Sequence, residues 1–106
     1  MEKVIELLKG ERKKLKSSIR FYKDEIEQDK NGIQELQSDL FIEKHKNASC
    51  WSADWTIHDY INVNVESRNR AIDDFSKRLK DAEEYLSQIE KALKILKVEH
   101  NLSVMR

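Results

Sequence analysis

The chain of 106 residues has the length of one small domain, which excludes a large enzyme built on a broad sheet. Charged residues make up 38% of it and hydrophobic residues 39%, with two Gly and no Pro, a profile that is typical of long exposed helices and that argues against sandwiches and barrels. The 20 basic and 20 acidic residues cancel, so net charge gives no argument for nucleic acid, a membrane or an acidic substrate.

Residues 2–46 carry apolar side chains spaced alternately by three and four positions, the pattern of a coiled-coil seam. The seam positions are Ile5, Leu8, Arg12, Leu15, Ile19, Tyr22, Ile26, Asp29, Ile33, Leu36 and Leu40. This pattern predicts one helix over residues 2–46. The dipeptide Asn31-Gly32 is a common turn signal, and a break there is the alternative. The seam keeps its phase from Ile26 to Ile33, which favours a continuous helix.

Residues 47–56 show no periodicity and are predicted to form the connection between two helices. Ser52 and Thr56 are the candidate N-caps for the helix that follows. Thr56 and Asp59 also have the spacing of a capping box, with Asp in place of the usual Glu. These signals predict that the next helix begins near residue 57.

A second seam predicts a helix over residues 57–100. Its positions are Ile61, Val65, Arg68, Ile72, Phe75, Leu79, Ala82, Leu86, Ile89, Leu93, Leu96 and His100. The segment 57–65 is rich in β-branched residues, so a short strand is the alternative there. Ile61 and Val65 fall in the phase of the seam, which favours the helix.

The two predicted helices are expected to fold back on one another. Residues 9–23 hold seven basic residues and one acidic residue, whereas residues 81–90 hold four acidic and none basic, so antiparallel pairing brings opposite charges together. We expect Asp29 to face Ile72 and Arg68 to face Ile33 across the pair of helices. Asp29 and Arg68 then lie in neighbouring layers of the seam, and we predict a diagonal ion pair between them. The alternative is that both side chains extend into water. The sequence thus predicts a single all-α domain of residues 1–106, a long antiparallel coiled-coil hairpin.

A two-helix hairpin buries one seam only, and small domains with so little core depend on further association. Apolar residues outside the seam lie near the joined chain ends. Those predicted to mediate self-association are Val4, Leu7, Tyr85, Ile95, Val98 and Leu102. We therefore predict a homodimer in which two hairpins form a four-helix bundle, with solvated surface residues as the alternative.

Aromatic residues are concentrated around the connection. The residues predicted to contact a protein partner are Phe41, Trp51, Trp55 and Tyr60. Tryptophan offers a large, stiff contact area that loses little entropy on docking. The alternative is that these rings fold over the end of the hairpin and cover its seam. The first hypothesis predicts a non-enzymatic protein–protein interaction module, such as an adaptor, inhibitor or regulator.

Basic residues of the first helix indicate an alternative function, the binding of nucleic acid. The residues that would contact phosphates are Arg12, Lys13, Lys16, Arg20 and Lys23. The acidic segment 24–43 follows directly and would repel a polyanion, which favours a solvated and internally compensated face. A protein partner is therefore the preferred interpretation.

Cys50 is the single cysteine, which excludes an internal disulfide. Its spacing from His45 and His58 matches no structural zinc pattern, and no predicted pocket would hold an oxyanion for a cysteine nucleophile. We therefore expect no metal, no cofactor and no enzymatic activity. No run of residues is apolar enough for a signal peptide or a membrane span, so the sequence predicts a cytoplasmic protein without membrane contact.

Overall fold

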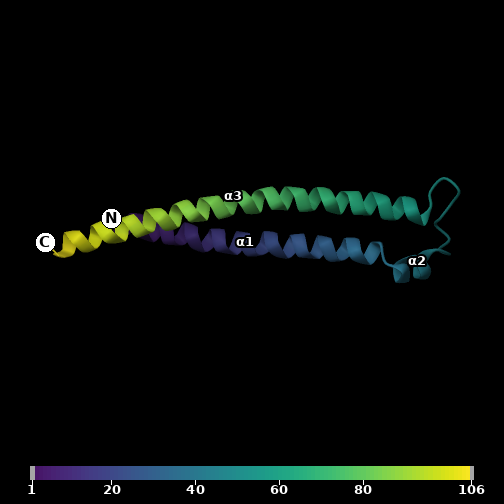
Figure 1. Ribbon diagram of the computed structural model, residues 1–106, viewed down its shortest axis with the longest axis horizontal. Coiled ribbons are helices and arrows are strands. Elements are labelled where there is room, and N and C mark those ends of the chain that lie inside the picture. The colour runs from purple at the N-terminus through teal and green to yellow at the C-terminus, as the bar shows by residue number, and fades with distance from the viewer. Residues whose placement is uncertain (1, 106) are drawn as a thin grey trace. The chain divides into compact units, whose positions relative to one another are not determined.

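The computed structural model describes residues 2–105, without the side chains of residues 100 and 102–105. The helices in this part are α1 (Glu2–Leu36), α2 (Asp39–His45) and α3 (Ile57–Met105) (Figure 1). No strand occurs among the described residues, which confirms the predicted all-α class. α3 continues past the predicted end at residue 100. No helix of the described part is long and apolar enough to cross a membrane.

The long helices α1 and α3 form the predicted hairpin, within which the chain groups into two compact units. The terminal unit takes residues 1–23 and 77–106. The loop unit takes residues 24–76 and includes α2 and the connection. Each unit combines a part of α1 with a part of α3, so the pairing predicted from the two seams is present within both.

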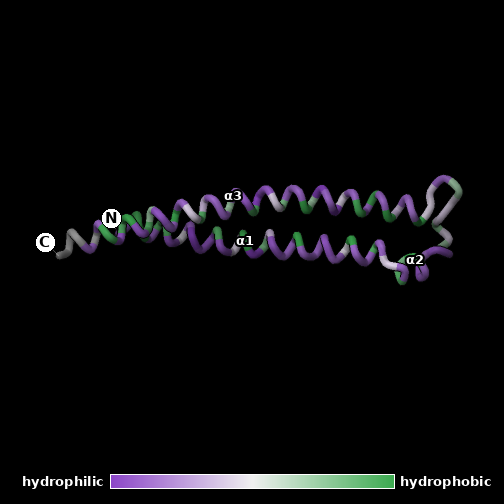
Figure 2. Tube along the Cα trace, viewed as in Figure 1, coloured by the Kyte–Doolittle hydropathy of each residue, from purple (hydrophilic) through white to green (hydrophobic). Residues whose placement is uncertain are grey.

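In the terminal unit, the side chains withdrawn from water are those of the predicted seams. Ala82, Ile89 and Leu93 of α3 are 8%, 3% and 2% exposed. Leu8 and Leu15 of α1 are half-buried. The recurrence of apolar residues along both helices is visible in Figure 2. Partial burial follows from the architecture, because a helix in a two-helix pair covers only one stripe of its neighbour.

The loop unit has its core where the chain reverses direction. Leu36 of α1 and Ile57 and Ile61 of α3 form a buried cluster, with each residue 7% or 8% exposed. The partly buried side chains that pack against this cluster are Phe41, Ile42, Trp51 and Val65. Removal of this apolar surface from water, at about 25 cal/mol per Å², stabilises the reversal of the chain.

Ser38 ends the first helix earlier than predicted and starts α2. Its backbone is extended, with φ −76° and ψ 147°. The Ser38 hydroxyl donates to the carbonyl oxygen of Glu35 at 2.7 Å and accepts from the amide of Phe41 at 3.2 Å. One bond satisfies a carbonyl at the end of α1 and the other an amide at the start of α2. The predicted single helix over residues 2–46 is therefore wrong beyond Leu36.

The position of this break changes which side chains face the seam. α1 runs through Asn31 and Gly32 without interruption, which confirms the predicted continuity at that dipeptide. Leu40, predicted as a seam residue, lies on α2 and is 77% exposed. That prediction is wrong because Ser38 resets the helical phase, so residues of α2 no longer continue the stripe of α1.

Thr56 is the N-cap of α3, as predicted. Its amide donates to Asp59 Oδ2 at 2.9 Å, and the amide of Asp59 donates to the Thr56 hydroxyl at 3.3 Å. These reciprocal bonds confirm the capping box and fix the start of α3 at Ile57. The alternative of a strand over residues 57–65 is therefore wrong.

The capping box should make the stability of the hairpin depend on pH. Hydrogen bonds from the Thr56 backbone and then its hydroxyl lower the pKa of the Asp59 carboxyl. This carboxylate therefore stabilises the folded state above its ordinary pKa, and that contribution is lost as the pH falls through the lowered value. Below about pH 4, the Tm of the wild type should fall more steeply than that of Asp59→Asn in circular dichroism melts. Parallel curves for the two proteins would contradict this role of Asp59.

An ion pair in the loop unit joins the two polar seam positions, as predicted. Arg68 Nη1 lies 3.3 Å from Asp29 Oδ1, and the Asp29 side chain is 16% exposed. The Arg68 guanidinium lies against α1 at Gly32, where a Cβ would come 2.8 Å from Arg68 Nε. The absence of a side chain at Gly32 therefore leaves room for the guanidinium beside α1.

Candidate functional site

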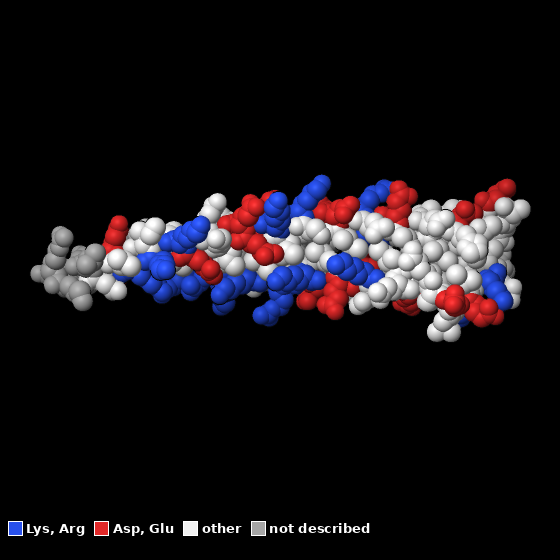
Figure 3. Space-filling view, in the orientation of Figure 1, with Lys and Arg blue, Asp and Glu red and all other residues white. Residues whose placement is uncertain are grey.

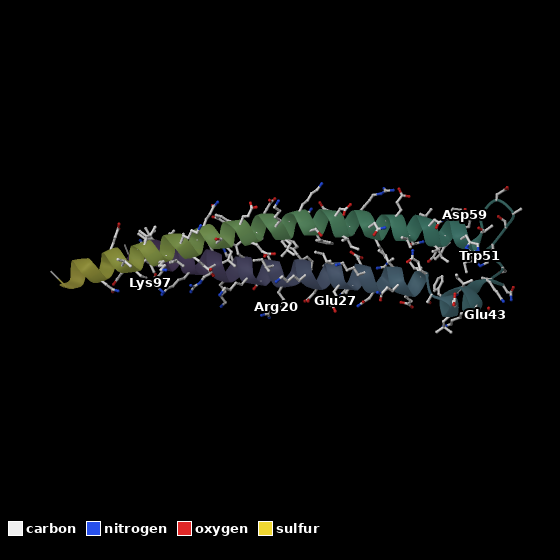
Figure 4. All side chains as sticks on the ribbon, viewed as in Figure 1. Arg20, Glu27, Glu43, Trp51, Asp59 and Lys97 are labelled. Carbon is white, nitrogen blue, oxygen red and sulfur yellow. The ribbon has the colours of Figure 1, made fainter. Side chains whose placement is uncertain are left out.

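Trp51 covers the end of the loop-unit core. Its ring packs against the buried cluster, and its indole Nε1 donates to the carbonyl oxygen of His45 at 2.5 Å. This bond ties the connection to the end of α2. The Trp51 ring, labelled in Figure 4, also contacts an aromatic ring of α3. Its centroid lies 5.5 Å from that of Tyr60. Trp51 therefore has the covering role that the sequence left open as an alternative, and its contact with a partner stays a prediction.

Phe41 and Tyr60 hold α2 against α3. Their rings are stacked at a centroid distance of 6.4 Å with an interplanar angle of 8°. The ring of Phe41 also lies 4.5 Å from that of His45. Of the four residues predicted to contact a partner, the structure thus brings Phe41, Trp51 and Tyr60 together in one packed group, which we call the aromatic cluster.

Trp55, the fourth of these residues, lies on a turn of its own. The amide of Ser52 donates to the Trp55 carbonyl oxygen at 2.8 Å, and the amide of Trp55 donates to the Ser52 hydroxyl at 3.1 Å. Ser52, the other candidate N-cap, therefore closes this turn and does not cap α3. The two bonds hold the backbone of Trp55, whose side chain is 42% exposed.

Leu40 is an exposed apolar residue that the sequence analysis did not predict to lie on the surface. The signal that indicates its exposure is the Ser38-Asp39 pair, which is typical of a helix start and predicts a change of helical phase before Leu40.

We call Leu40 and Trp55 the docking residues. Figure 3 shows a largely uncharged surface at the end of the molecule that holds the connection, with both acidic and basic side chains beside it. Each docking residue directly follows an aspartate in the sequence, Asp39 or Asp54.

Charge is divided unequally between the two units. The loop unit has 5 basic and 12 acidic residues, a net charge of −7, and the terminal unit has 15 basic and 8 acidic residues, a net charge of +7. Screening limits the reach of surface charges to about 8 Å at physiological salt, so a partner experiences the local charge and not the total. An argument about partners therefore has to come from local charge, because the total of zero conceals this imbalance.

A groove on α1 collects most of the residues predicted to bind nucleic acid. Its volume is about 440 Å³, and its lining residues are Lys9, Arg12, Lys13, Lys16, Ser17 and Arg20. All six belong to the terminal unit. Lys23, also predicted, is exposed but does not line the groove. We call this feature the basic groove.

The residues predicted to mediate self-association are exposed wherever the structure describes them. Val4 is 48% exposed, Leu7 69%, Tyr85 48%, Ile95 59% and Val98 54%, and all belong to the terminal unit. The side chain of Leu102 lies outside the described residues. The exposure leaves these side chains available to a second copy, and the homodimer stays a prediction.

The zinc site considered from the sequence does not assemble in the described part of the chain. Within residues 2–105, no group of three or more His, Cys, Asp or Glu side chains is placed to hold a metal ion. Cys50 is exposed on the connection, whereas the ring of His45 packs against Phe41. The docking residues and the basic groove are therefore the candidate binding surfaces of the described chain.

Comparison with known proteins gives no relative: no family model, curated protein or solved structure matches the chain. The class of protein is defined by the fold alone, an all-α helical hairpin. Its function has to follow from the chemistry of the two surfaces.

Proposed function

We propose that this protein is a non-enzymatic interaction module, an adaptor, inhibitor or regulator, that docks on a protein partner through Leu40 and Trp55. The observation that carries the proposal is the exposure of these two large apolar side chains, 77% and 42%, on backbone held by hydrogen bonds. Tryptophan dominates the binding energy of many protein interfaces, where it fills a pocket of the partner.

The backbone around both docking residues is fixed before a partner arrives. The Ser38 cap orders the start of α2 next to Leu40, and the Ser52 turn orders the backbone of Trp55. The aromatic cluster holds α2 against α3. A preorganised surface loses less conformational entropy on binding, so more of its contact energy appears as affinity. Burial of a leucine-sized side chain contributes about 1.5–3 kcal/mol.

The charge near the docking residues indicates the chemistry of the partner. Residues 37–62 hold four acidic residues and two basic residues, a local net charge of −2. Two of the acidic residues, Asp39 and Asp54, adjoin Leu40 and Trp55 in the sequence. A partner with an apolar recess bordered by Lys and Arg would match both properties. Charge complementarity of this kind speeds association and rejects acidic competitors. The proposed ligand is therefore a basic protein surface.

The proposal also includes a cytoplasmic location and a homodimer formed through the terminal unit. Support for the dimer comes from Val4, Leu7, Ile95 and Val98, which are between 48% and 69% exposed in a unit whose core is one seam. A four-helix bundle of two hairpins would cover such side chains.

Pull-down from a lysate of the source cells tests the docking residues with Leu40→Ala and Trp55→Ala. We expect a partner that the wild type captures to be lost by both variants, since truncating an interface hot spot weakens binding by about 2 kcal/mol or more. The captured partner should be basic, and it should remain bound when the salt concentration is raised, because apolar burial carries the contact.

Phe21→Ala is the matched control for these variants. Phe21 is 53% exposed, comparable with Trp55, but it lies in the terminal unit and is not among the residues predicted to self-associate. This variant should capture the same partner as the wild type, and circular dichroism should show equal helicity for all four proteins. Capture that is unchanged by Leu40→Ala and Trp55→Ala, or reduced equally by Phe21→Ala, would contradict the proposal.

A further inference from the structure

The basic groove lies along a single face of α1. Its residues occur at positions 9, 12, 13, 16, 17 and 20, the spacing that places side chains on one side of a helix. Figure 3 shows basic side chains gathered along this part of α1, and Arg20 extends from the helix into solvent (Figure 4). Five of the six lining side chains are positively charged and none is acidic.

The five cations of the groove make no close ion pair with a described residue. Acidic residues of segment 81–90 belong to the same unit and offset part of this positive charge at longer range. The acidic residue of segment 9–20, Glu11, does not line the groove and lies 3.8 Å from Lys14 instead. The other residues of the terminal unit, 10 basic and 8 acidic, add a net charge of +2. The groove is therefore a local anion-attracting surface in spite of the neutral chain.

The length of the groove limits how many phosphates it can meet. Lys9 and Arg20 are eleven positions apart, which corresponds to about 16 Å along a helix. That length of duplex axis holds about nine phosphates on its two strands, and the winding of the strands turns part of them away from the groove. The five cations can therefore neutralise at most five phosphates.

The lining side chains also indicate which nucleic acid fits. The groove contains no aromatic ring on which an unpaired base could stack. It also lacks Asn and Gln, which read adenine in the major groove. Lys, Arg and Ser remain. All three are common phosphate ligands, and Lys and Arg also pair with guanine in the major groove. We infer that the basic groove of α1 binds the phosphate backbone of a nucleic-acid duplex.

This site is independent of the docking residues, which belong to the loop unit. A competing occupant is the loop unit of a second copy, whose net charge of −7 would also be attracted to the groove. The duplex is the better match because it carries negative charge along its whole length, whereas the loop unit mixes 12 acidic with 5 basic residues.

Fluorescence anisotropy with a labelled DNA duplex of about 20 base pairs tests the inference on the full-length protein. Five phosphate contacts predict that log Kobs falls with log salt at a slope of about −4.5. The triple variant Lys9→Gln/Lys13→Gln/Lys16→Gln should reduce the slope to about −1.8 and weaken binding by about 100-fold or more at low salt. A duplex of unrelated sequence should bind equally well.

The matched control is Lys77→Gln/Lys80→Gln/Lys91→Gln, which removes the same charge from exposed residues of the same unit outside the groove. It should leave the salt slope near the wild-type value and weaken binding only a few-fold. Glutamine keeps a helix propensity close to that of lysine, so both variants should retain their helicity.

Three results would overturn the inference. One is the absence of duplex binding at about 50 mM salt, where nonspecific phosphate contacts are strong. Another is equal weakening by the two triple variants, which would make binding a matter of net charge alone. The third is salt-sensitive self-association, measured by sedimentation, that the groove variant abolishes while the duplex stays unbound, because the occupant would then be a second copy.

Discussion

Replacing Trp51 with alanine is expected to lower the free energy of unfolding by about 2–3 kcal/mol. The substitution removes a ring that packs against the buried cluster of the loop unit, and it leaves the carbonyl oxygen of His45 without its indole donor. The expected value lies below the roughly 3–5 kcal/mol for a fully buried Trp because Trp51 is half-buried. Urea unfolding followed by circular dichroism measures it.

Two further variants divide this effect into its parts. One separates ring packing from the indole hydrogen bond, and the other compares Trp51 with an exposed tryptophan. Trp51→Phe keeps an aromatic ring but loses the indole N–H, so a cost of about 1 kcal/mol is expected. Trp55→Ala removes the same kind of side chain from an exposed turn and should change stability by about 0.5 kcal/mol or less. Equal destabilisation by Trp51→Ala and Trp55→Ala would show that Trp51 does not cover the core.

The parts of the fold that depend on periodic burial could be predicted from the sequence. Ile89 and Leu93, two of the least exposed residues, occupy predicted seam positions, because burial in a helix pair depends on spacing along the chain. The capping box of Thr56 and Asp59 could be predicted for a related reason. Its partners are three residues apart, so their contact requires nothing from the rest of the fold.

The break at Ser38 depends on contacts that spacing does not contain. The heptad phase favours a continuous helix. α2 takes a new direction, in which Phe41 stacks on Tyr60 of α3. The stronger local stop signal, Asn31-Gly32, does not end the helix. Its glycine serves the approach of Arg68, a contact between distant positions that turn propensity does not report.

The candidate site could be located from the sequence, but the roles of its residues could not be assigned. Trp51 and Trp55 are four positions apart in the same connection, and their difference comes from the carbonyl of His45, which accepts from one indole. Leu40 occupies a predicted seam position, but the helix break at Ser38 leaves it exposed. The charge separation likewise requires knowing which parts of the chain share a unit.

Arg68→Ala is expected to lower the free energy of unfolding by about 2 kcal/mol, because it leaves the Asp29 carboxylate without its cation. The Asp29 side chain is 16% exposed, and no described group donates to its Oδ2. The expected cost is below the roughly 3–5 kcal/mol for breaking a fully buried pair, since the Arg68 side chain is 41% exposed and water screens it in part. Chemical denaturation measures the difference.

The two glycines of α1 test whether the space at Gly32 serves this ion pair. Gly10→Ala should stabilise the protein by about 1 kcal/mol, because a Cβ there meets nothing within 4 Å. Gly32→Ala should lose that gain, since its Cβ would take the place of the Arg68 guanidinium and displace it from Asp29. In an Arg68→Ala background, the same Gly32→Ala should recover about 1 kcal/mol, because the guanidinium is gone. If Gly32→Ala stabilised the wild type as much as Gly10→Ala, the Arg68 side chain would have made room for the methyl group, and the space at Gly32 would not serve the ion pair.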